Sequence, residues 1–153
     1  MKYTFYCMVI LLLGIYGCKK DDDKEQGEQP DYTERDEQII QDYFVDNNIT
    51  DTIADPSGMY IKHLEIGDGE QVTGDIDQIK VLYTGYYLPT EVVFDNAQSP
   101  GVWMALDGLI EGWQIGIPYM KKGGKATLYI PSRYAYKSNV LKFNITLLDF
   151  TTK

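Results

Sequence analysis

The side chains that most often carry enzyme chemistry are scarce in this chain. It has two cysteines, Cys7 and Cys18, and both belong to its first segment. Its single histidine is His63. A zinc site or a Cys/His catalytic pair needs more such residues in one folded domain, so the sequence argues against both classes. We therefore expect neither a metal ion nor a cofactor.

The charge of the chain limits its partners. The chain has 153 residues and a formal net charge of −9. The acidic residues are scattered or lie in the N-terminal tail, which indicates a solvated acidic surface rather than an acidic active site. We expect no binding to nucleic acid or to an anionic membrane surface, because both repel a chain of this charge.

The first residues have the pattern of an export signal. Lys2 precedes an apolar run over residues 5–16, which is too short to span a membrane comfortably. Residues 13–18 resemble a bacterial lipobox, in which the cysteine is lipidated and becomes the new N-terminus. We expect residues 1–17 to be a lipoprotein signal peptide and Cys18 to carry a lipid anchor in the membrane. The alternative is an ordinary signal peptide with an incidental cysteine.

A charged segment follows this cysteine. Residues 18–32 contain almost no apolar side chains, so we expect a flexible acidic tether that cannot offset its own ordering entropy. Within it, residues 19–24 resemble the Lys-acidic-acidic signal that sends some Gram-negative lipoproteins to the cell surface. We expect an outer-membrane lipoprotein of the cell envelope. Surface display and a simple solvated tether are the two alternatives for this segment.

Residues 33–56 are expected to form an N-terminal helix and a linker. Four apolar residues recur at a helical spacing and predict a helix over residues 34–48, with Thr33 as its N-cap. We expect this apolar stripe to pack on the following domain, with a partner protein as the alternative. The stripe consists of Ile39, Ile40, Tyr43 and Phe44.

From residue 57 onward the pattern becomes that of a sheet. Apolar and polar residues alternate over Tyr60–Glu65 and over 79–84, and His63 is expected on the surface of the first strand rather than as a ligand. Further short strands are predicted at 92–94, 102–106, 126–130 and 140–148.

One helix interrupts these strands. It is predicted over residues 110–120, with Ile110, Trp113 and Ile117 on one face and Pro118 distorting its last turn. Several strands and one helix predict an α+β domain over residues 57–153, in which an antiparallel sheet carries the helix on one face.

Six short motifs follow one another within this domain. Their order and spacing resemble those of the FKBP family of peptidyl-prolyl isomerases, over about residues 59–150. Each motif alone is a weak signal, whereas six in the same order are specific. They are Val81-Leu82-Tyr83-Thr84-Gly85, Val93-Phe94-Asp95, Leu109-Ile110-Glu111-Gly112-Trp113, Met120-Lys121-Lys122-Gly123-Gly124-Lys125, Ile130-Pro131-Ser132-Arg133-Tyr134-Ala135-Tyr136 and Leu141-Lys142-Phe143-Asn144-Ile145.

The resemblance implies both a fold and a reaction. The fold is a twisted antiparallel sheet wrapped over one short helix, which agrees with the periodicity. The reaction is rotation about an X-Pro peptide bond, whose uncatalysed barrier is about 18–20 kcal/mol. The enzyme has to bind the twisted, less polar amide better than either planar isomer. The implied partners are proline-containing polypeptide segments, and the implied role is assistance to the folding of exported proteins.

The resemblance also assigns a substrate pocket. Trp113 would form its floor beneath the proline ring. Ile110 would offer its backbone N–H to the peptide, and Tyr136 would offer its hydroxyl to a carbonyl group. Asp95 would accept a hydrogen bond from the Tyr83 hydroxyl. The other walls would come from Phe94, Leu109 and Phe143, with Met104 where the family often has Phe. Taken singly, each aromatic residue has an ordinary core position as its alternative.

The chain departs from the family pattern after Tyr136. Lys137-Ser138-Asn139 leads almost directly to Val140, so a long loop that closes one side of the pocket is missing. An open and wetter pocket stabilises the twisted amide less, which predicts reduced isomerase activity. The alternatives are a non-catalytic FKBP-like chaperone or proline-segment binding module, and an accessory lipoprotein of a larger envelope complex.

Overall fold

The computed structural model of the chain describes residues 31–153, and these form one compact unit. The predicted signal peptide, Cys18 and nearly all of the predicted tether lie outside the described residues. Among the helices of the described part, none is long and apolar enough to cross a membrane. The boundaries predicted between tether, N-terminal helix and domain stay predictions.

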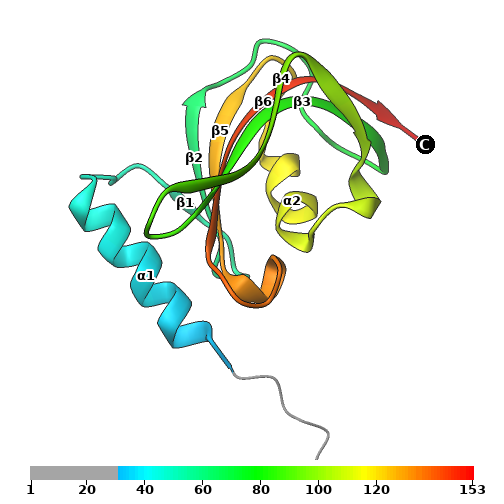
Figure 1. Cartoon of the computed structure of the whole chain (residues 1–153). Helices are drawn as coiled ribbons and strands as arrows, with labels where there is room; N and C mark the ends of the chain where they lie inside the picture. The colour runs from blue at the N-terminus through cyan, green and yellow to red at the C-terminus, as the bar shows by residue number, and fades with distance from the viewer. Residues whose placement is uncertain (1–30) are drawn as a thin grey trace, which may run out of the picture. The chain divides into compact units, whose positions relative to one another are not determined.

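Six strands form one sheet in the order β1-β2-β5-β6-β3-β4, and every neighbouring pair is antiparallel (Figure 1). The sheet curves around a short helix, and a longer helix precedes it in the chain. The predicted α+β class and its wrapped antiparallel sheet are therefore confirmed. The strands are β1 (Ile53–Ala54), β2 (Tyr60–Glu65), β3 (Ile76–Tyr87), β4 (Val92–Ala105), β5 (Lys125–Ile130) and β6 (Leu141–Thr152).

The two helices, α1 (Thr33–Asp46) and α2 (Glu111–Gly116), lie on opposite faces of this sheet. On β5, Leu128 and Ile130 belong to the core beneath α2, whereas Tyr129 between them packs with α1. Successive side chains of a strand point to opposite faces, so this alternation separates the two helices. Both faces of the strand are buried as a result.

Several predicted elements differ in the structure. The strands predicted at 92–94 and 102–106 are two parts of one long strand, β4. The helix predicted over 110–120 is the short α2 followed by a 3-10 turn, Ile117–Tyr119, because the proline in that turn cannot continue the helical hydrogen bonding. The two-residue strand β1 lies within the predicted linker and pairs with β2.

The start of α1 also corrects a prediction. Thr33 is the first helical residue, and the residue in the N-cap position, Tyr32, makes no capping hydrogen bond. Asp31 instead supplies the hydrogen-bond acceptor at the N-terminal end of α1. Its carboxylate accepts hydrogen bonds from the Thr33 N–H at 2.9 Å and from the Thr33 hydroxyl at 2.6 Å.

The apolar stripe of α1 packs against the sheet, as predicted. Ile40 is fully buried, and the Phe44 ring meets the Tyr129 ring edge-on with 4.8 Å between centroids. An exposed stripe would have favoured the accessory-lipoprotein alternative, and the described part of α1 offers no such surface. The cluster between α1 and the sheet consists of Ile40, Tyr43, Phe44, Leu88, Tyr129 and Val140.

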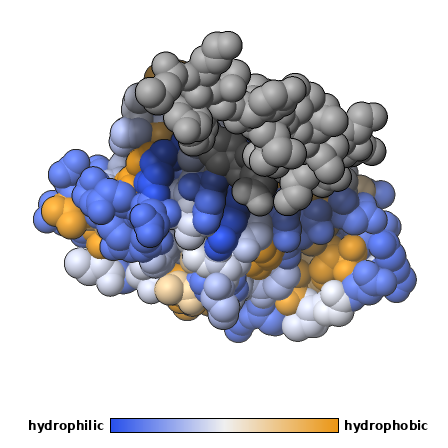
Figure 2. Space-filling model, turned by 90° about the horizontal axis from the view of Figure 1, so that it is seen from below, coloured by the Kyte–Doolittle hydropathy of each residue, from blue (hydrophilic) through white to orange (hydrophobic). Residues whose placement is uncertain are grey.

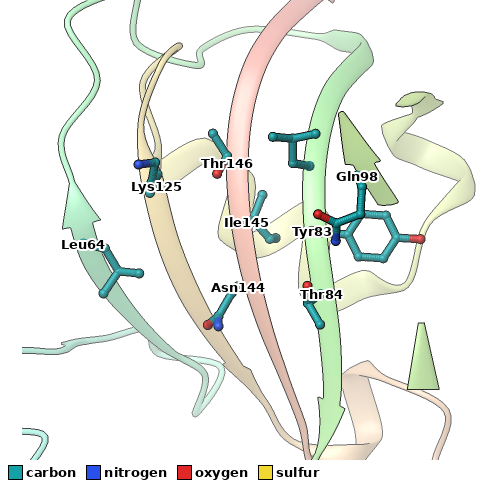
Figure 3. Close-up of a pocket in the computed structure, with 9 residues that line it drawn as sticks. Leu64, Tyr83, Thr84, Gln98, Lys125, Asn144, Ile145 and Thr146 are labelled. Atoms are coloured by element: carbon teal, nitrogen blue, oxygen red, sulfur yellow. The ribbon is translucent and has the colours of Figure 1, made fainter. Parts of the chain in front are cut away.

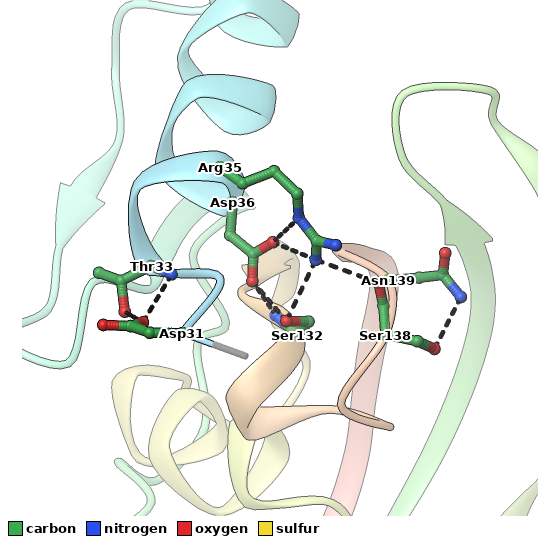
Figure 4. A network of polar contacts seen from close by, with 7 residues as sticks. All are labelled: Asp31, Thr33, Arg35, Asp36, Ser132, Ser138 and Asn139. Atoms are coloured by element: carbon green, nitrogen blue, oxygen red, sulfur yellow. Dashed lines mark hydrogen bonds and ion pairs between the residues drawn. The ribbon is translucent and has the colours of Figure 1, made fainter. Parts of the chain in front are cut away.

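A buried carboxylate fastens the first turn of α1 to the segment before β6. Asp36 is 1% exposed and accepts hydrogen bonds from the Ser132 N–H at 2.7 Å and from its hydroxyl at 2.6 Å. The Arg35 guanidinium pairs with the same carboxylate at 2.6 Å and donates to the Ser138 carbonyl at 3.1 Å (Figure 4). Helix and turn are thus joined by bonds that span about a hundred residues of sequence.

A second polar cluster joins the middle of α1 to the sheet. Lys142 on β6 is 8% exposed, donates to the Tyr43 hydroxyl oxygen at 3.0 Å and forms an ion pair with Glu91. The Tyr43 hydroxyl donates to the same Glu91 carboxylate at 2.5 Å. Burial lowers the pKa of Lys142, but its bonds to Glu91 and Tyr43 outweigh burial and leave the pKa raised. The buried lysine therefore stays charged and paired.

Some large hydrophobic side chains remain on the surface of the described part. In the view from below, hydrophobic surface forms separate patches among hydrophilic residues (Figure 2). Isolated apolar residues of this kind are normal for a folded protein, whereas a group of them beside a hollow calls for an explanation. Four of the most exposed are Val45, Ile66, Val92 and Tyr136.

We expect Asp36→Ala to lower the free energy of unfolding by about 2–3 kcal/mol, because the buried N–H and hydroxyl of Ser132 lose a charged acceptor. Urea denaturation followed by circular dichroism measures this change. The matched control is Asp42→Ala, which removes an exposed carboxylate from the same helix and should stay within about 0.5 kcal/mol. Equal effects of the two substitutions would contradict the clamp.

Candidate active site

A small aromatic hollow, with a volume of about 60 Å³, lies between α2 and the sheet. Seven of the eight residues assigned to the pocket from the sequence line it, and the eighth, Phe94, packs against two of these seven. The fold therefore brings together residues from five separate segments of the chain. The lining consists of Tyr83, Asp95, Met104, Leu109, Ile110, Trp113, Tyr136 and Phe143.

Trp113 forms the floor of the hollow. It lies on α2, is 3% exposed, and meets the rings of Tyr83 and Phe143 edge-on, each at 5.2 Å between centroids. Aromatic pairs favour this geometry because a positive ring edge meets a negative ring face. The floor is therefore held by packing and has no freedom to tilt.

Gly85 on β3 gives two wall residues the space that they occupy. A Cβ atom at this position would lie 2.7 Å from the Phe143 ring and 2.8 Å from the Phe94 ring. The sequence identified this glycine only as the last residue of a motif. Tyr87, two residues further on the same strand, stacks on Phe94 at 4.6 Å and was not predicted as part of the site. The period-two pattern, continued past Gly85, is the signal that points to it.

One hydrogen bond connects the polar groups at the edge of the hollow. The Tyr83 hydroxyl donates to Asp95 Oδ2 at 2.7 Å, as the family resemblance implied. Burial of the ring, together with the hydrogen bond to Asp95 and its negative charge, raises the pKa of Tyr83 to about 12. The second carboxylate oxygen of Asp95 accepts the Asn96 N–H at 2.8 Å. Asp95 is thereby held in place, and it adds to the effect of burial in favouring the neutral Tyr83 phenol.

Two further donors lie at the rim. Ile110 immediately precedes α2, and within residues 31–153 its N–H has no hydrogen-bond acceptor. The Tyr136 hydroxyl is the other donor, and burial together with the charge of Asp95 raises its pKa. The hollow can thus hold an apolar ring over Trp113 while its rim donates hydrogen bonds to carbonyl groups.

The turn that carries Tyr136 is short, as the sequence predicts. Lys137, Ser138 and Asn139 are exposed, and Val140 already belongs to the core. Tyr136 is 59% exposed, and its ring lies 6.3 Å from the Phe94 ring between centroids. This side of the hollow is therefore open to water.

A larger hollow of about 240 Å³ lies on the opposite face of the sheet (Figure 3). Asn144 and Thr146 line it, and they alternate along β6 with Phe143 of the aromatic hollow. Its one charged side chain, Lys125, is paired with Glu65 at 2.8 Å. Tyr83 is its one aromatic lining residue, and it has neither a cluster of aromatic rings nor an unpaired charge, so we assign the site to the smaller aromatic hollow.

His63 lies half-buried on β2, outside the aromatic hollow, as expected for a strand residue. Residues 31–153 contain no group of His, Cys, Asp or Glu side chains arranged to hold a metal ion.

Comparison with known families identifies the domain that carries these residues. The model of the FKBP-type peptidyl-prolyl cis-trans isomerase family matches residues 69–148. A probable FKBP-type peptidyl-prolyl cis-trans isomerase, FkpA, of Neisseria meningitidis is 40% identical over 83 residues, which cover 53% of this chain and 30% of that protein. FkpA of Escherichia coli is 35% identical over 104 residues, covering 61% and 38%. The chain thus spans about a third of the length of these relatives.

Solved structures agree on the fold. The crystal structure of FkpA from Escherichia coli matches with a TM-score of 0.66 and 27% identity, over 78% of this chain and 63% of that chain. A peptidyl-prolyl cis-trans isomerase from Pseudomonas syringae matches with a TM-score of 0.65 over 82% of this chain and 98% of the other. The latter is 24% identical and supports the fold alone.

We expect Asp95→Asn to lower the pKa of Tyr83 from about 12 while leaving it above the ordinary tyrosine value, because burial, the largest cause, persists. NMR titration of the labelled Tyr83 ring measures this shift. Because the folded pKa is raised, the stabilisation from the neutral phenol is present below about pH 10 and is lost as the pH rises through about 12. Asp42→Asn is the control, and an unchanged Tyr83 titration in Asp95→Asn would contradict the coupling.

Proposed function

The chain belongs to the FKBP-type peptidyl-prolyl cis-trans isomerase family, and from this premise we propose that it isomerises X-Pro bonds in exported polypeptides and so assists their folding. The observation that carries the proposal is the aromatic hollow, in which Trp113, Tyr83 and Phe143 surround a space beside free rim donors. The reaction needs little more than this, since no covalent bond is made or broken.

The apolar walls favour the transition state of the rotation. Twisting an amide removes its resonance and makes it less polar, so a site that excludes water stabilises the twisted form over both planar isomers. Trp113 supports the proline ring from below. The edge-on contacts of Trp113 with Tyr83 and Phe143 hold the indole ring in place while the X-Pro bond rotates. A rate gain of five orders of magnitude requires about 7 kcal/mol of such differential binding.

The rim donors hold the part of the peptide that does not rotate. We propose that the Ile110 N–H and the Tyr136 hydroxyl, which both lie at the rim, donate to carbonyl groups of the bound peptide. Asp95 acts through Tyr83, whose hydroxyl it orients at 2.7 Å. Carbonyl groups anchored at the rim let the twist concentrate in the single X-Pro bond.

The open side of the hollow limits this catalysis. Tyr136 is 59% exposed, and water that reaches the amide stabilises its planar, polar forms. We therefore propose reduced isomerase activity with retained binding of proline-containing segments. The second candidate, a non-catalytic binding module of the FKBP type, is favoured by the same exposed rim.

We further propose that the chain is a lipoprotein of the outer membrane, anchored through Cys18. The support is the sequence alone: an apolar run ends in a lipobox-like motif, and a charged segment follows. The Lys-acidic-acidic pattern at residues 19–24 supports display on the cell surface. Such an anchor would bring the isomerase to polypeptides that have just been exported.

We expect the full chain to accelerate X-Pro exchange in a short peptide, and Trp113→Leu to reduce that rate at least tenfold, or about 1.4 kcal/mol, because the proline ring loses its floor. Exchange NMR on a proline peptide measures both rates. Trp103→Leu is the matched control, since Trp103 is 44% exposed and does not line the hollow. It should keep the parent rate.

A second variant guards against a folding defect in Trp113→Leu. Asp95 is exposed, so Asp95→Ala should leave the chain folded at the assay temperature, which thermal unfolding checks, while it slows exchange. If the parent chain binds the peptide without accelerating exchange, the binding-module alternative replaces the enzyme. If it neither binds nor accelerates, both candidate functions are wrong.

Lipidation is tested in cells. We expect Cys18→Ser to move the protein from the membrane fraction to the soluble fraction and to abolish labelling by a fatty acid. Cys7→Ser is the matched control, because Cys7 lies inside the apolar run and should be removed with the signal peptide. Labelling that survives Cys18→Ser, or a parent protein that is never labelled, would rule out the anchor.

A further inference from the structure

An aromatic surface extends from the hollow toward the hairpin that joins β3 and β4. The Phe143 ring at the wall lies 5.5 Å from the Phe94 ring, and Phe94 stacks on Tyr87 at 4.6 Å with 29° between their planes. The Tyr136 ring also neighbours Phe94, in an edge-on arrangement with 6.3 Å between centroids. Because the turn after Tyr136 is short and exposed, this surface is open beside the hollow rather than covered.

The surface continues onto an exposed valine. Val92 lies directly opposite Tyr87 in the β3–β4 ladder, so the two side chains share one face of the hairpin. Val92 is 58% exposed. We call the group of Tyr87, Val92, Phe94 and Tyr136 the hairpin shelf.

The next residue along the strand provides a contrast. Val93 is 48% exposed and lies opposite Tyr86, on the other face of the hairpin. Tyr86 packs there under the Lys142 ammonium, 4.4 Å from the ring centroid. Val92 and Val93 thus share a residue type and similar exposure, but only Val92 is joined to the hollow.

The spacing of the shelf fits a polypeptide that already occupies the hollow. An extended chain advances about 3.3 Å per residue, so two or three residues span the distance from Phe143 past Phe94 to Tyr87. A polypeptide segment whose proline lies over Trp113 can therefore place a nearby side chain on the hairpin shelf while it stays extended.

The chemistry of the shelf selects an uncharged apolar side chain. Its own members are aromatic or aliphatic, and the carboxylates that adjoin Val92 and Phe94 in sequence are already engaged: Glu91 by Lys142 and Tyr43, and Asp95 by Tyr83. A basic side chain finds no free carboxylate among these groups, and an acidic one would face their negative charge. Burial of apolar area is the favourable interaction that remains.

We propose that the hairpin shelf is a second subsite of the proposed isomerase, which binds an apolar side chain two to four residues from the proline of an extended, unfolded polypeptide. This inference rests on the proposed function, because the proline in the hollow anchors the segment. It restricts the preferred substrates to proline segments that carry a large apolar residue nearby, as segments of unfolded protein cores do.

The test uses the full chain and a set of peptides with one X-Pro bond in an alanine-rich sequence. Each peptide carries a single Phe at two, three or four positions before or after the proline, and the reference peptide has Ala throughout. Exchange NMR gives the rate and the binding constant for each peptide. We expect at least one Phe position to improve kcat/KM or binding by about fivefold over the reference, since a half-exposed shelf gives less than a closed pocket.

Variants locate the effect. Val92→Asp should reduce the Phe gain to less than about twofold, and Val92→Thr, which keeps the shape of valine, should reduce it in part. Val93→Asp and Val93→Thr are the matched controls on the opposite face and should keep the full gain. The gain is a ratio of two peptides on one variant, so a change in folded fraction cancels.

Each remaining outcome is decisive. If the alanine peptide is exchanged or bound but no Phe position helps, the shelf is not a subsite and the proposed function stands. If the gain survives Val92→Asp, or falls equally in Val93→Asp, the apolar residue binds elsewhere. If the chain forms a dimer that Val92→Asp dissolves, the shelf serves a second copy instead. If even the alanine peptide is neither exchanged nor bound, the proposed function fails and this inference fails with it.

Discussion

The close approach of α2 to β5 is the constraint on which the rest of the domain depends. A Cβ at Gly112 would lie 2.4 Å from Ile130, and one at Gly116 would lie 2.6 Å from Leu128, so only glycines allow the helix to lie this near the sheet. Trp113 lies between these glycines in sequence and is pressed into the ring of aromatic side chains. A more distant helix would leave the floor of the hollow unsupported.

This arrangement makes the site mostly apolar, and the few polar groups then gain importance. The bond from Tyr83 to Asp95 satisfies a phenol hydroxyl and a carboxylate at the edge of an otherwise apolar site. The short turn at Tyr136 acts in the opposite direction, because it admits water to one side. The same opening uncovers the aromatic surface around Phe94. The opening therefore makes the site wetter and also lengthens the aromatic surface available to a polypeptide.

Much of this could be predicted from the sequence, for identifiable reasons. Local patterns can be recognised without a structure. They include the alternation in β2, β3 and β6 and the motifs around Tyr83 and Trp113. The continuity of β4 could not be recognised in this way, because its polar middle belongs to a strand only through the pairing of β4 with β3. The contact between Asp36 and Ser132 was also out of reach, since it joins residues 96 positions apart and leaves no periodic trace. The stripe on α1 predicted burial but could not identify the covering residues.

Helix α1 also explains how so short a turn can hold Tyr136 in place. The turn begins at Ser132, which Asp36 holds, and its Ser138 carbonyl accepts a hydrogen bond from Arg35. It ends at Val140, which is buried in the cluster under the same helix. Because these contacts fix the turn at both ends and in between, the turn is ordered without the support of a long loop. The helix that precedes the domain is therefore part of the structure that positions the rim of the site.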